Sequence, residues 1–270
     1  MTDKPTAQHK NHDAYFVPGL HRGLLVMETI AQERRRMSVT AIAKKLGLTR
    51  SSVFRLTYTL KQMGFLESSP ESKEFGLGAR VLNIGFAYLA SQDIIEVARP
   101  HLEALRDETN VSSHLAIRDG HDVLYLDCVQ TRSGFFSNLN VGSRLPAHAS
   151  PLGWLLLSNL SPREIVELYE EQPFDMLSEH TPRDIQALML RVAEAASKGH
   201  VVSRGIVEIG GSSVAAPIHD KSGAVVAALD ISGPDSAFDF GTTGHGYTDA
   251  VIETARSISR RLGHMPRTSD

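Results

Sequence analysis

Cysteine is almost absent from this 270-residue chain, which contains only Cys128. A single cysteine cannot form an intramolecular disulfide, so the composition favours a reducing compartment. Long apolar runs are absent too: stretches such as Trp154 to Leu157 are far shorter than the ~18 residues that a membrane-spanning helix needs. Residues 1–16 are polar and lack the apolar core of a secretory signal. We therefore expect a cytoplasmic protein that makes no membrane contact.

Catalytic and cofactor-binding motifs are missing as well. The chain has no G-x-S-x-G nucleophile elbow and no glycine loop of the Walker or dinucleotide type. Ser150, His148 and either Asp127 or Asp230 supply the residue types of a catalytic triad, but nothing in their spacing favours one. We expect no catalytic residue and no cofactor, and hence no enzyme.

Metal-ligand patterns are equally rare despite twelve histidines, because no H-x-H, H-E-x-x-H or Cys-His cluster occurs. His114 and His121 flank an expected hairpin and could meet across it, where a structural or solvent-facing role is favoured over a metal site. Cys128 alternates within an expected strand, which favours a buried and inert thiol. We expect no bound metal.

Charge is distributed unevenly along the chain. The formal net charge is only −3, yet residues 1–80 carry 13 Lys+Arg against 7 Asp+Glu, and the remainder carries 15 against 24. A basic head on an acidic body is typical of a nucleic-acid-binding module joined to a part that does not touch nucleic acid. A chance fluctuation of surface charge is the alternative.

The basic head has the pattern of a helix-turn-helix. A helix is expected from Leu20 to about Gln32, with Leu24, Met27 and Ala31 on its apolar face. A short helix follows from Val39 to Leu46, capped by a serine and ended by a glycine suited to a left-handed turn.

A third helix and a hairpin complete this head. Thr49 can cap a helix that runs to about Met63 and buries Val53, Leu56, Leu60 and Met63, which recur at helical spacing. Two short extended runs, residues 65–67 and 74–77, flank a polar turn that contains proline. This order predicts a winged helix-turn-helix.

The third helix leaves a polar and basic face for DNA. In a helix-turn-helix the start of this helix enters the major groove, where arginine reads guanine or phosphate and hydroxyls contact phosphate or base edges. The expected DNA-binding residues are Lys44, Lys45, Thr49, Arg50, Ser51, Ser52, Arg55, Tyr58 and Lys73, the last at the tip of the wing. A solvated basic helix pair is the alternative. Phe54 can face DNA or pack under the first helix.

The rest of the chain alternates helices and strands. A linker helix is expected over residues 79–92, with Leu82, Gly85, Phe86 and Leu89 inward, after a disordered tail at 1–16 and the DNA-binding domain at 17–78. The second domain, 93–265, is expected to have strands at 111–118, 123–129, 136–141, 201–203, 213–219 and 224–232. Its helices are expected at 93–108, 152–160 and 247–262 and after the pairs Ser161-Pro162 and Thr181-Pro182.

Seven segments together resemble the IclR family of bacterial transcriptional regulators over almost the whole chain. They are LHRGLLVMETIA (20–31), VTAIAKKLGLTRSSVFRLTYTLKQMGFLE (39–67), FGLGARVLNIGFAYLA (75–90), VARPHLEALRDET (97–109), GSRLPAHASPLGWLLL (142–157), VAAPIHDKSGAVVAALDISGP (214–234) and ISRRLG (258–263). The resemblance implies an α+β protein: an N-terminal winged helix-turn-helix joined by a linker helix to a GAF-like α/β effector-binding domain. It further implies dimers or tetramers that control operons, often for the catabolism of aromatic or small organic acids.

A ligand pocket is expected in the second domain. From the residues themselves, Asp230 and Ser232 lie two apart on an otherwise apolar strand and so share a face. The resemblance implies a carboxylate near the start of the helix that follows LPAHAS, and expected effector-binding residues Ser150, Leu152, Gly153, Ser203, Ser213, Asp230 and Ser232. Two departures concern Pro151, which has no N–H to donate, and Trp154, which stands where many relatives have Lys or Arg. Serine at 213 is similar to members that respond to aromatic acids.

We therefore expect a regulator that binds a double-stranded DNA operator as a homodimer or tetramer and responds to an aromatic or other small carboxylic acid. One recognition helix reads only a half-site, so DNA binding requires at least a dimer. The alternative is a small-molecule sensor that acts through protein partners without specific DNA binding. A recognition face that lacks basic residues would favour that alternative.

Overall fold

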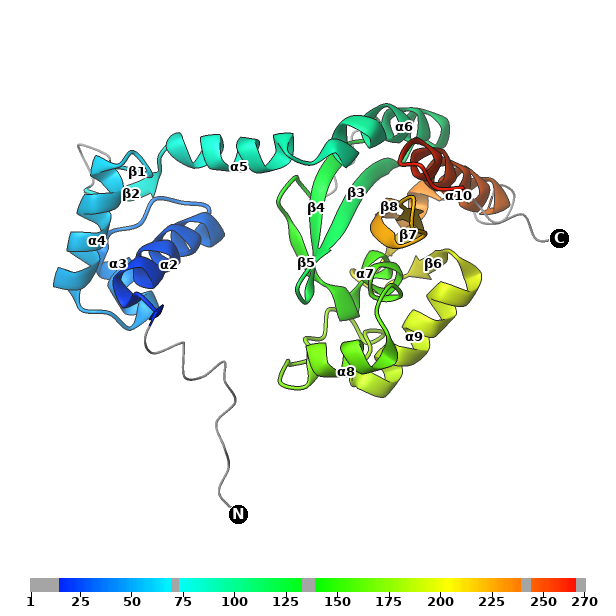
Figure 1. Ribbon diagram of the computed structural model, residues 1–270. Helices are drawn as coiled ribbons and strands as arrows, with labels where there is room; N and C mark the ends of the chain where they lie inside the picture. The colour runs from blue at the N-terminus through cyan, green and yellow to red at the C-terminus, as the bar shows by residue number, and fades with distance from the viewer. Residues whose placement is uncertain (1–14, 69–72, 133–138, 239–243, 266–270) are drawn as a thin grey trace, which may run out of the picture. The chain divides into compact units, whose positions relative to one another are not determined.

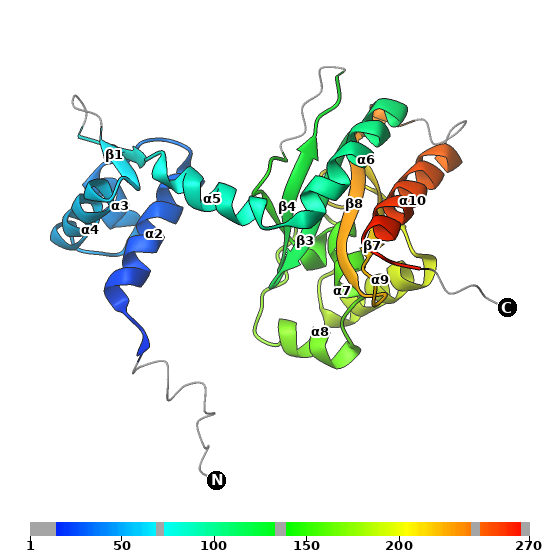
Figure 2. The same ribbon diagram turned by 45° about the horizontal axis from the view of Figure 1, so that its top comes forward.

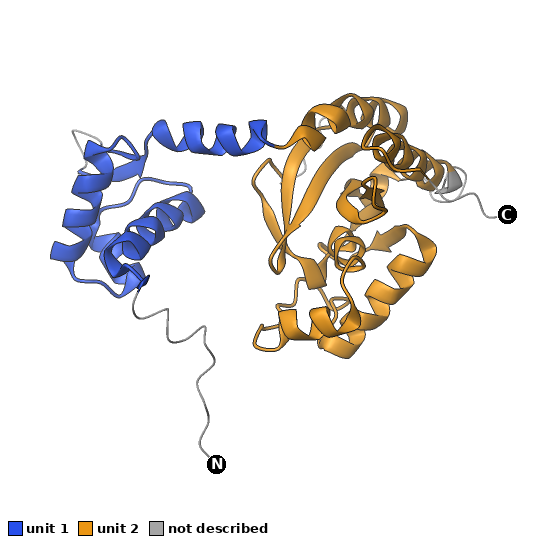
Figure 3. Cartoon of the chain, in the orientation of Figure 1, with its two compact units in different colours: residues 1–91 blue, residues 92–270 orange. Residues whose placement is uncertain are grey.

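The computed structural model describes residues 15–68, 73–132, 139–238 and 244–265, with only the backbone at 244 and 245. The chain divides into two compact units, residues 1–91 and 92–270 (Figure 3). Most of the expected N-terminal tail lies outside the described residues. No helix in the described ranges is both long and apolar enough to cross a membrane.

The first unit is a three-helix core with a two-stranded wing and a following helix (Figure 1). Its elements are α2 (Pro18–Glu33), α3 (Val39–Leu46), α4 (Arg50–Gln62), β1 (Leu66–Ser68), β2 (Phe75–Leu77) and α5 (Arg80–Ala90). Ser38 and Thr49 cap α3 and α4 by accepting backbone N–H groups, and Gly47 ends α3 with φ 65°. β1 and β2 pair in antiparallel register, so the predicted winged helix-turn-helix is confirmed.

The face that α2 buries differs from the expected one. Val26 and Ile30 are buried in the core of the unit, whereas Leu24 is half exposed. The helix carries apolar residues on two faces, so periodicity alone cannot choose between them. Tertiary packing makes the choice: Val26 and Ile30 belong to one hydrophobic core with Ile42 of α3 and Val53 of α4. The predicted apolar face is therefore wrong for Leu24 and Ala31, which are exposed, whereas Met27 is half-buried and packs against the core.

Two other packing predictions in this unit need correction. Met63 is 46% exposed, and Thr57 is buried instead, with its hydroxyl donating to the backbone carbonyl of Phe54 at 3.0 Å. No residue of α5 is buried, and Leu82 and Phe86 are exposed rather than inward. The helix is apolar as expected, but the described residues of its own unit leave its apolar side chains unburied.

The second unit is built on a six-stranded antiparallel sheet in the order β5-β4-β3-β8-β7-β6. Its strands are β3 (Ser112–Asp119), β4 (Asp122–Val129), β5 (Arg144–Pro146), β6 (Val201–Arg204), β7 (Gly211–His219) and β8 (Val225–Pro234). Its helices are α6 (Asp93–Thr109), η1 (Ala147–Ala149), α7 (Pro151–Leu157), α8 (Pro162–Tyr169), α9 (Ile185–Lys198), η2 (Asp235–Ala237) and α10 (Gly244–Arg261). Helices α6 and α10 lie side by side on one face of the sheet, and α7 packs on the other against α9 (Figures 1 and 2).

Local signals predicted most of these elements. The Asp119-Gly120 turn joins β3 to β4 with Gly120 at φ 62°, and Ser161 opens α8 through a capping box with Glu164. Thr181-Pro182 does not open a helix, because the Thr181 hydroxyl instead accepts the N–H groups of residues 177 and 178. α9 begins later, with Asp184 as its cap.

The prediction of a strand at residues 136–141 is also wrong for residues 139–141, and residues 136–138 lie outside the described residues. Residues 139–141 belong to no strand, and the edge of the sheet is formed by β5. β5 is only three residues long and pairs with β4 through Asp122 to Leu124. It leads directly through η1 into α7, which places α7 over the sheet.

Candidate functional site

Helix α4 presents an exposed stripe of basic and aromatic side chains. Arg50, Ser51, Phe54, Arg55 and Tyr58 are all exposed and lie on the part of the helix surface that the buried Val53 and Thr57 leave free. The guanidinium groups of the two arginines have no hydrogen bond or ion pair with any residue that the structure describes. Phe54, which the sequence left open, is 59% exposed on this stripe. Arginine and an exposed aromatic ring together suit base edges and thymine methyl groups in a major groove.

The other predicted DNA-binding residues differ in whether their side chains already have a partner within the protein. Lys44 and Lys73 are exposed, and Lys73 has φ 53° beside the wing. Lys45 forms an ion pair with Glu33 and thereby lowers the pKa of that carboxyl. The Thr49 hydroxyl accepts the N–H of Ser52 at 3.2 Å, so both residues serve first as the cap of α4.

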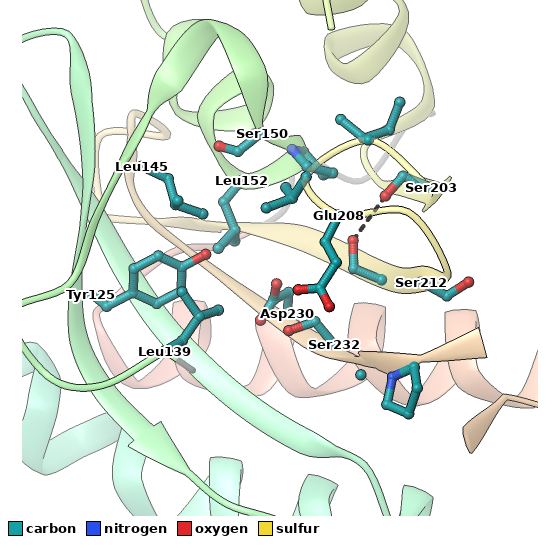
Figure 4. Close-up of a pocket in the computed structure, with 17 residues that line it drawn as sticks. Tyr125, Leu139, Leu145, Ser150, Leu152, Ser203, Glu208, Ser212, Asp230 and Ser232 are labelled. Atoms are coloured by element: carbon teal, nitrogen blue, oxygen red, sulfur yellow. Dashed lines mark hydrogen bonds between the residues drawn. The ribbon is translucent and has the colours of Figure 1, made fainter. Parts of the chain in front are cut away.

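A cavity of about 240 Å³ lies in the second unit between α7 and the sheet (Figure 4). Its lining residues are Tyr125, Leu139, Leu145, Ser150, Pro151, Leu152, Ser203, Ile206, Val207, Glu208, Gly211, Ser212, Ser213, Asp230, Ser232, Gly233 and Pro234. Six of the seven predicted effector residues are among them, and Gly153 is the exception. Among the residues that the sequence did not single out are Tyr125 and Glu208, which carry polar groups.

The register of the sheet gathers the polar side chains of this cavity. Ser203 on β6 lies opposite Ser213 on β7, and Ser213 lies opposite Ser232 on β8. Directly opposed residues share a face, so three hydroxyls form a row across three strands. The Oγ atoms of Ser203 and Ser213 are 2.9 Å apart, and Figure 4 shows this hydrogen bond.

Asp230 is the buried charged group of the cavity. It lies opposite His114 of β3 in the register and is only 4% exposed. Its Oδ1 is 2.8 Å from Nδ1 of His114, the geometry of an N–H donating to a carboxylate. Ser232 Oγ is 3.4 Å from the same nitrogen. This contact holds the carboxylate in place at the wall of the cavity.

Tyr125 adds a neutral hydroxyl to the same cavity. Burial, reinforced by the nearby Asp230, raises the pKa of the tyrosine well above its ordinary value. Its ring meets the His114 ring edge-on, with centroids 5.8 Å apart. Tyr125 therefore stays protonated at neutral pH and its O–H is available as a donor.

The start of α7 offers less to an anion than the resemblance implied. Pro151 has no N–H, and the N–H of Gly153 donates to Ser150 Oγ at 3.1 Å. The N–H of Trp154 donates to the Ser150 carbonyl, which leaves only that of Leu152 in this turn without a partner among the described residues. Gly153 has a packing role instead, because a Cβ there would lie 2.0 Å from the Ala147 carbonyl oxygen.

Trp154, the other noted departure, does not line this cavity. Its indole N–H donates to the His148 carbonyl at 2.8 Å, and the guanidinium of Arg191 lies 5.3 Å from its ring centroid. The described residues that line the cavity include no lysine, arginine or histidine, whereas two of them, Asp230 and Glu208, carry carboxyl groups. The cavity is thus rich in hydroxyl groups and negative in charge.

The structure separates the residue sets that could suggest catalysis or metal binding. Ser150 Oγ caps α7, and Nε2 of His148 lies 3.0 Å from the Asp175 carbonyl, so the structure shows no hydrogen bond between Ser150 and His148. His114 and His121 do not meet across the hairpin, since Nε2 of His121 lies 2.7 Å from the Leu168 carbonyl instead. Within the described ranges no three His, Cys, Asp or Glu residues could hold a metal ion.

Cys128 should react very slowly in the folded protein. Burial, with help from Asp230 and Asp127, raises the pKa of its thiol to about 12. At pH 8 the thiolate fraction, and with it the rate of attack on a chromogenic disulfide reagent, should be about a thousandfold lower than in denaturant, where the pKa is about 8.5. Rates within tenfold of each other, measured with the same reagent, would contradict this burial.

Comparison with known proteins places this architecture in one family. The model of the IclR helix-turn-helix domain matches residues 19–70, and that of the IclR C-terminal domain matches residues 86–260. The transcriptional repressor AllR of Escherichia coli K12 is 30% identical over 90% of this chain and 90% of its own length.

Two solved structures have the same fold. A transcriptional regulator from Rhodococcus sp. RHA1 is 31% identical, covers 92% of this chain and 98% of its own, and has a TM-score of 0.78. An IclR homologue from Microbacterium hydrocarbonoxydans, solved with 4-hydroxybenzoate, is 26% identical over 90% of this chain and 98% of its own, with a TM-score of 0.76.

A winged helix-turn-helix joined to an α/β unit with an internal polar cavity defines a DNA-binding regulator with a sensor domain. The chain belongs to the IclR family of bacterial transcriptional regulators. It is a transcriptional regulator with a helix-turn-helix DNA-binding domain and a C-terminal effector-binding domain, and it is not an enzyme.

Proposed function

We propose that this protein controls a catabolic operon in the cytoplasm and responds to an aromatic or other small carboxylic acid bound in the cavity under α7. The observation that carries the proposal is the cavity itself, whose hydroxyl-rich wall faces apolar side chains from α7 and the loops. The homologue solved with 4-hydroxybenzoate supports an aromatic acid as the class of effector. The proposed effector-binding residues are Ser150, Leu152, Ser203, Ser213, Asp230 and Ser232.

On the DNA side, we propose that α4 reads the operator. Arg50 and Arg55 are exposed and unpaired among the described residues, which supports direct contact with bases or phosphates. Ser51 and Tyr58 flank them on the same stripe. The proposed supporting contacts to the DNA backbone are Lys44, Lys45, Thr49, Ser52 and Lys73.

A homodimer, or a tetramer built from dimers, is the proposed functional form. One α4 helix reads a half-site, and a palindromic operator needs two. The uncovered apolar residues of α5, such as Leu82 and Phe86, and Leu20 and Leu24 of α2 support pairing between subunits. An effector changes the DNA affinity of such an assembly only if it binds the DNA-competent and the incompetent arrangement with different affinity.

Fluorescence anisotropy tests this function. The purified full chain is titrated onto DNA upstream of its own reading frame, at two salt concentrations and with or without a panel of aromatic and aliphatic carboxylates. We expect binding that is tighter than to scrambled DNA, weakens with salt and shifts with one class of acid.

Specific binding that no acid changes would contradict the proposed effector class and leave the DNA-binding role intact. Absence of specific binding on every candidate upstream region would favour the alternative, a sensor that acts through protein partners. The exposed arginines of α4 argue against that alternative, because unpaired basic side chains on a recognition helix are typical of a surface that binds DNA.

A further inference from the structure

Asp230 has a free acceptor that faces the cavity. Its Oδ1 accepts from His114, whereas no hydrogen bond to Oδ2 exists among the described residues. Oδ2 is also not among the fully buried orphan atoms, so it borders the open space of the cavity. A carboxylate oxygen that faces a partly enclosed cavity is a strong acceptor, so a ligand that donates a hydrogen bond to it is favoured.

The charge of the cavity limits which ligand group can lie beside Asp230. Glu208 contributes a second, exposed carboxyl group, and the described residues that line the cavity include no basic side chain. His114 hydrogen-bonds Oδ1 of Asp230 but is not a lining residue, so it does not face the ligand. A carboxylate placed against Asp230 would meet like charge at short range in a partly dry site. The group next to Asp230 is therefore a donor, and the acid group of the effector lies elsewhere in the cavity, nearer the hydroxyls.

We propose that the effector carries a hydroxyl group that donates to Oδ2 of Asp230, so that the protein selects hydroxylated aromatic acids over their unsubstituted counterparts. The inference deepens the proposed effector role of this cavity and rests on it. It makes Asp230 the residue that determines specificity, with His114 as a positioning residue that orients the carboxylate.

The size of the cavity agrees with a single substituted ring. An apolar protein cavity of about 150 Å³ holds benzene, and this one offers about 240 Å³. Leu145, Leu152 and Ile206 supply the apolar surface for the ring. The hydroxyl row of Ser203, Ser213 and Ser232 and the O–H of Tyr125 remain for the second polar group of the ligand.

Calorimetric titration of the full-length protein tests the proposal with four probes: benzoate, 4-hydroxybenzoate, 4-methoxybenzoate and phenol. In the wild-type protein 4-hydroxybenzoate should bind about tenfold more tightly than 4-methoxybenzoate, since only the former donates to a charged acceptor. Phenol, which lacks the acid group, should bind weakly but measurably.

The key variant is Asp230→Asn, which keeps an oxygen to accept from His114 and turns an NH₂ donor toward the ligand. The preference for the hydroxylated acid should fall to within about threefold, and benzoate should bind more tightly than it does to the wild type because the like charge is gone. Glu170→Gln is the matched control: it makes the corresponding change from carboxylate to amide at an exposed residue that does not line the cavity, and it should leave the ratio of hydroxy to methoxy acid unchanged.

The outcomes separate this inference from the function on which it rests. Acids that bind without preference for the hydroxyl, or equal ratios in wild type and Asp230→Asn, overturn the inference but keep the acid effector. Phenol binding that Asp230→Asn abolishes, with no acid bound, keeps the hydroxyl contact and overturns the acid class. Absence of binding by all four probes at millimolar concentration overturns both.

Discussion

Replacing Arg55 by alanine should weaken binding to operator DNA by about 10- to 100-fold, because a bidentate arginine contact contributes about 1–3 kcal/mol. Arg55 lies in the middle of the exposed stripe of α4, one residue from Phe54. Its guanidinium has no protein partner in the described part of the chain, so its removal leaves no buried charge unpaired. The fold should therefore be unaffected, and thermal unfolding of the variant should match that of the wild type.

Arg50→Ala distinguishes base contact from phosphate contact. Arg50 is the first residue of α4. Loss of a phosphate contact there lowers the affinity for all sequences alike and reduces the salt dependence by about one unit of slope, whereas loss of a base contact lowers the affinity for the operator selectively. Arg163→Ala is the control for charge, since Arg163 is exposed on α8 in the other unit and pairs only with Glu167. Anisotropy titrations at several salt concentrations give affinity and slope together. Unchanged operator affinity in both α4 variants would overturn the assignment of α4 as the recognition helix.

Gly153→Ala should destabilise the second unit by about 3 kcal/mol, because the new methyl group overlaps backbone that cannot move aside. A Cβ at this position would lie 2.0 Å from the carbonyl oxygen and 2.5 Å from the Cα of Ala147. Every residue of α7 is buried, so the helix has no free side toward which to shift. For a unit of this size the loss corresponds to a melting temperature lower by roughly 10 °C.

Gly246→Ala is the matched control, since it makes the same change in the same unit. No atom of the described residues lies within 4 Å of a Cβ at Gly246 in α10, so the variant should be as stable as the wild type or slightly more so. Calorimetric melting of both variants measures the difference. Equal melting temperatures for Gly153→Ala and the wild type would show that the contact between η1 and α7 relaxes freely, contrary to the tight packing described above.

Elements with local signals were predictable, and elements defined by tertiary packing were not. Caps such as Ser38, Thr49 and Ser161 and the Asp119-Gly120 turn depend on hydrogen bonds or backbone angles within a few residues. The expected helix after Thr181-Pro182 failed because the threonine hydroxyl closes a turn with preceding N–H groups. The local sequence is compatible with a helix cap and with this turn, and contacts with the neighbouring chain favour the turn.

The cavity shows the same division. Asp230 and Ser232 could be placed on one face from their spacing, because side chains alternate along a strand. Their meeting with Ser203, Ser213 and His114 depends on the register of strands that lie far apart in the sequence. The free Oδ2 of Asp230 and the absence of a basic lining residue therefore had no counterpart in the sequence pattern.

By itself, the sequence determined the class of protein: a basic winged helix-turn-helix head, an acidic α/β body and the motifs of one regulator family. These features depend on residue order and composition, because short-range hydrogen bonds and the periodicity of apolar residues define the helices and strands locally. Only the tertiary structure decided which face of α2 is buried, that Gly153 packs rather than binds, and that Asp230 borders an acidic cavity. Such features arise from close contacts between segments that are distant in the sequence, and a local sequence pattern cannot predict which of these segments come together.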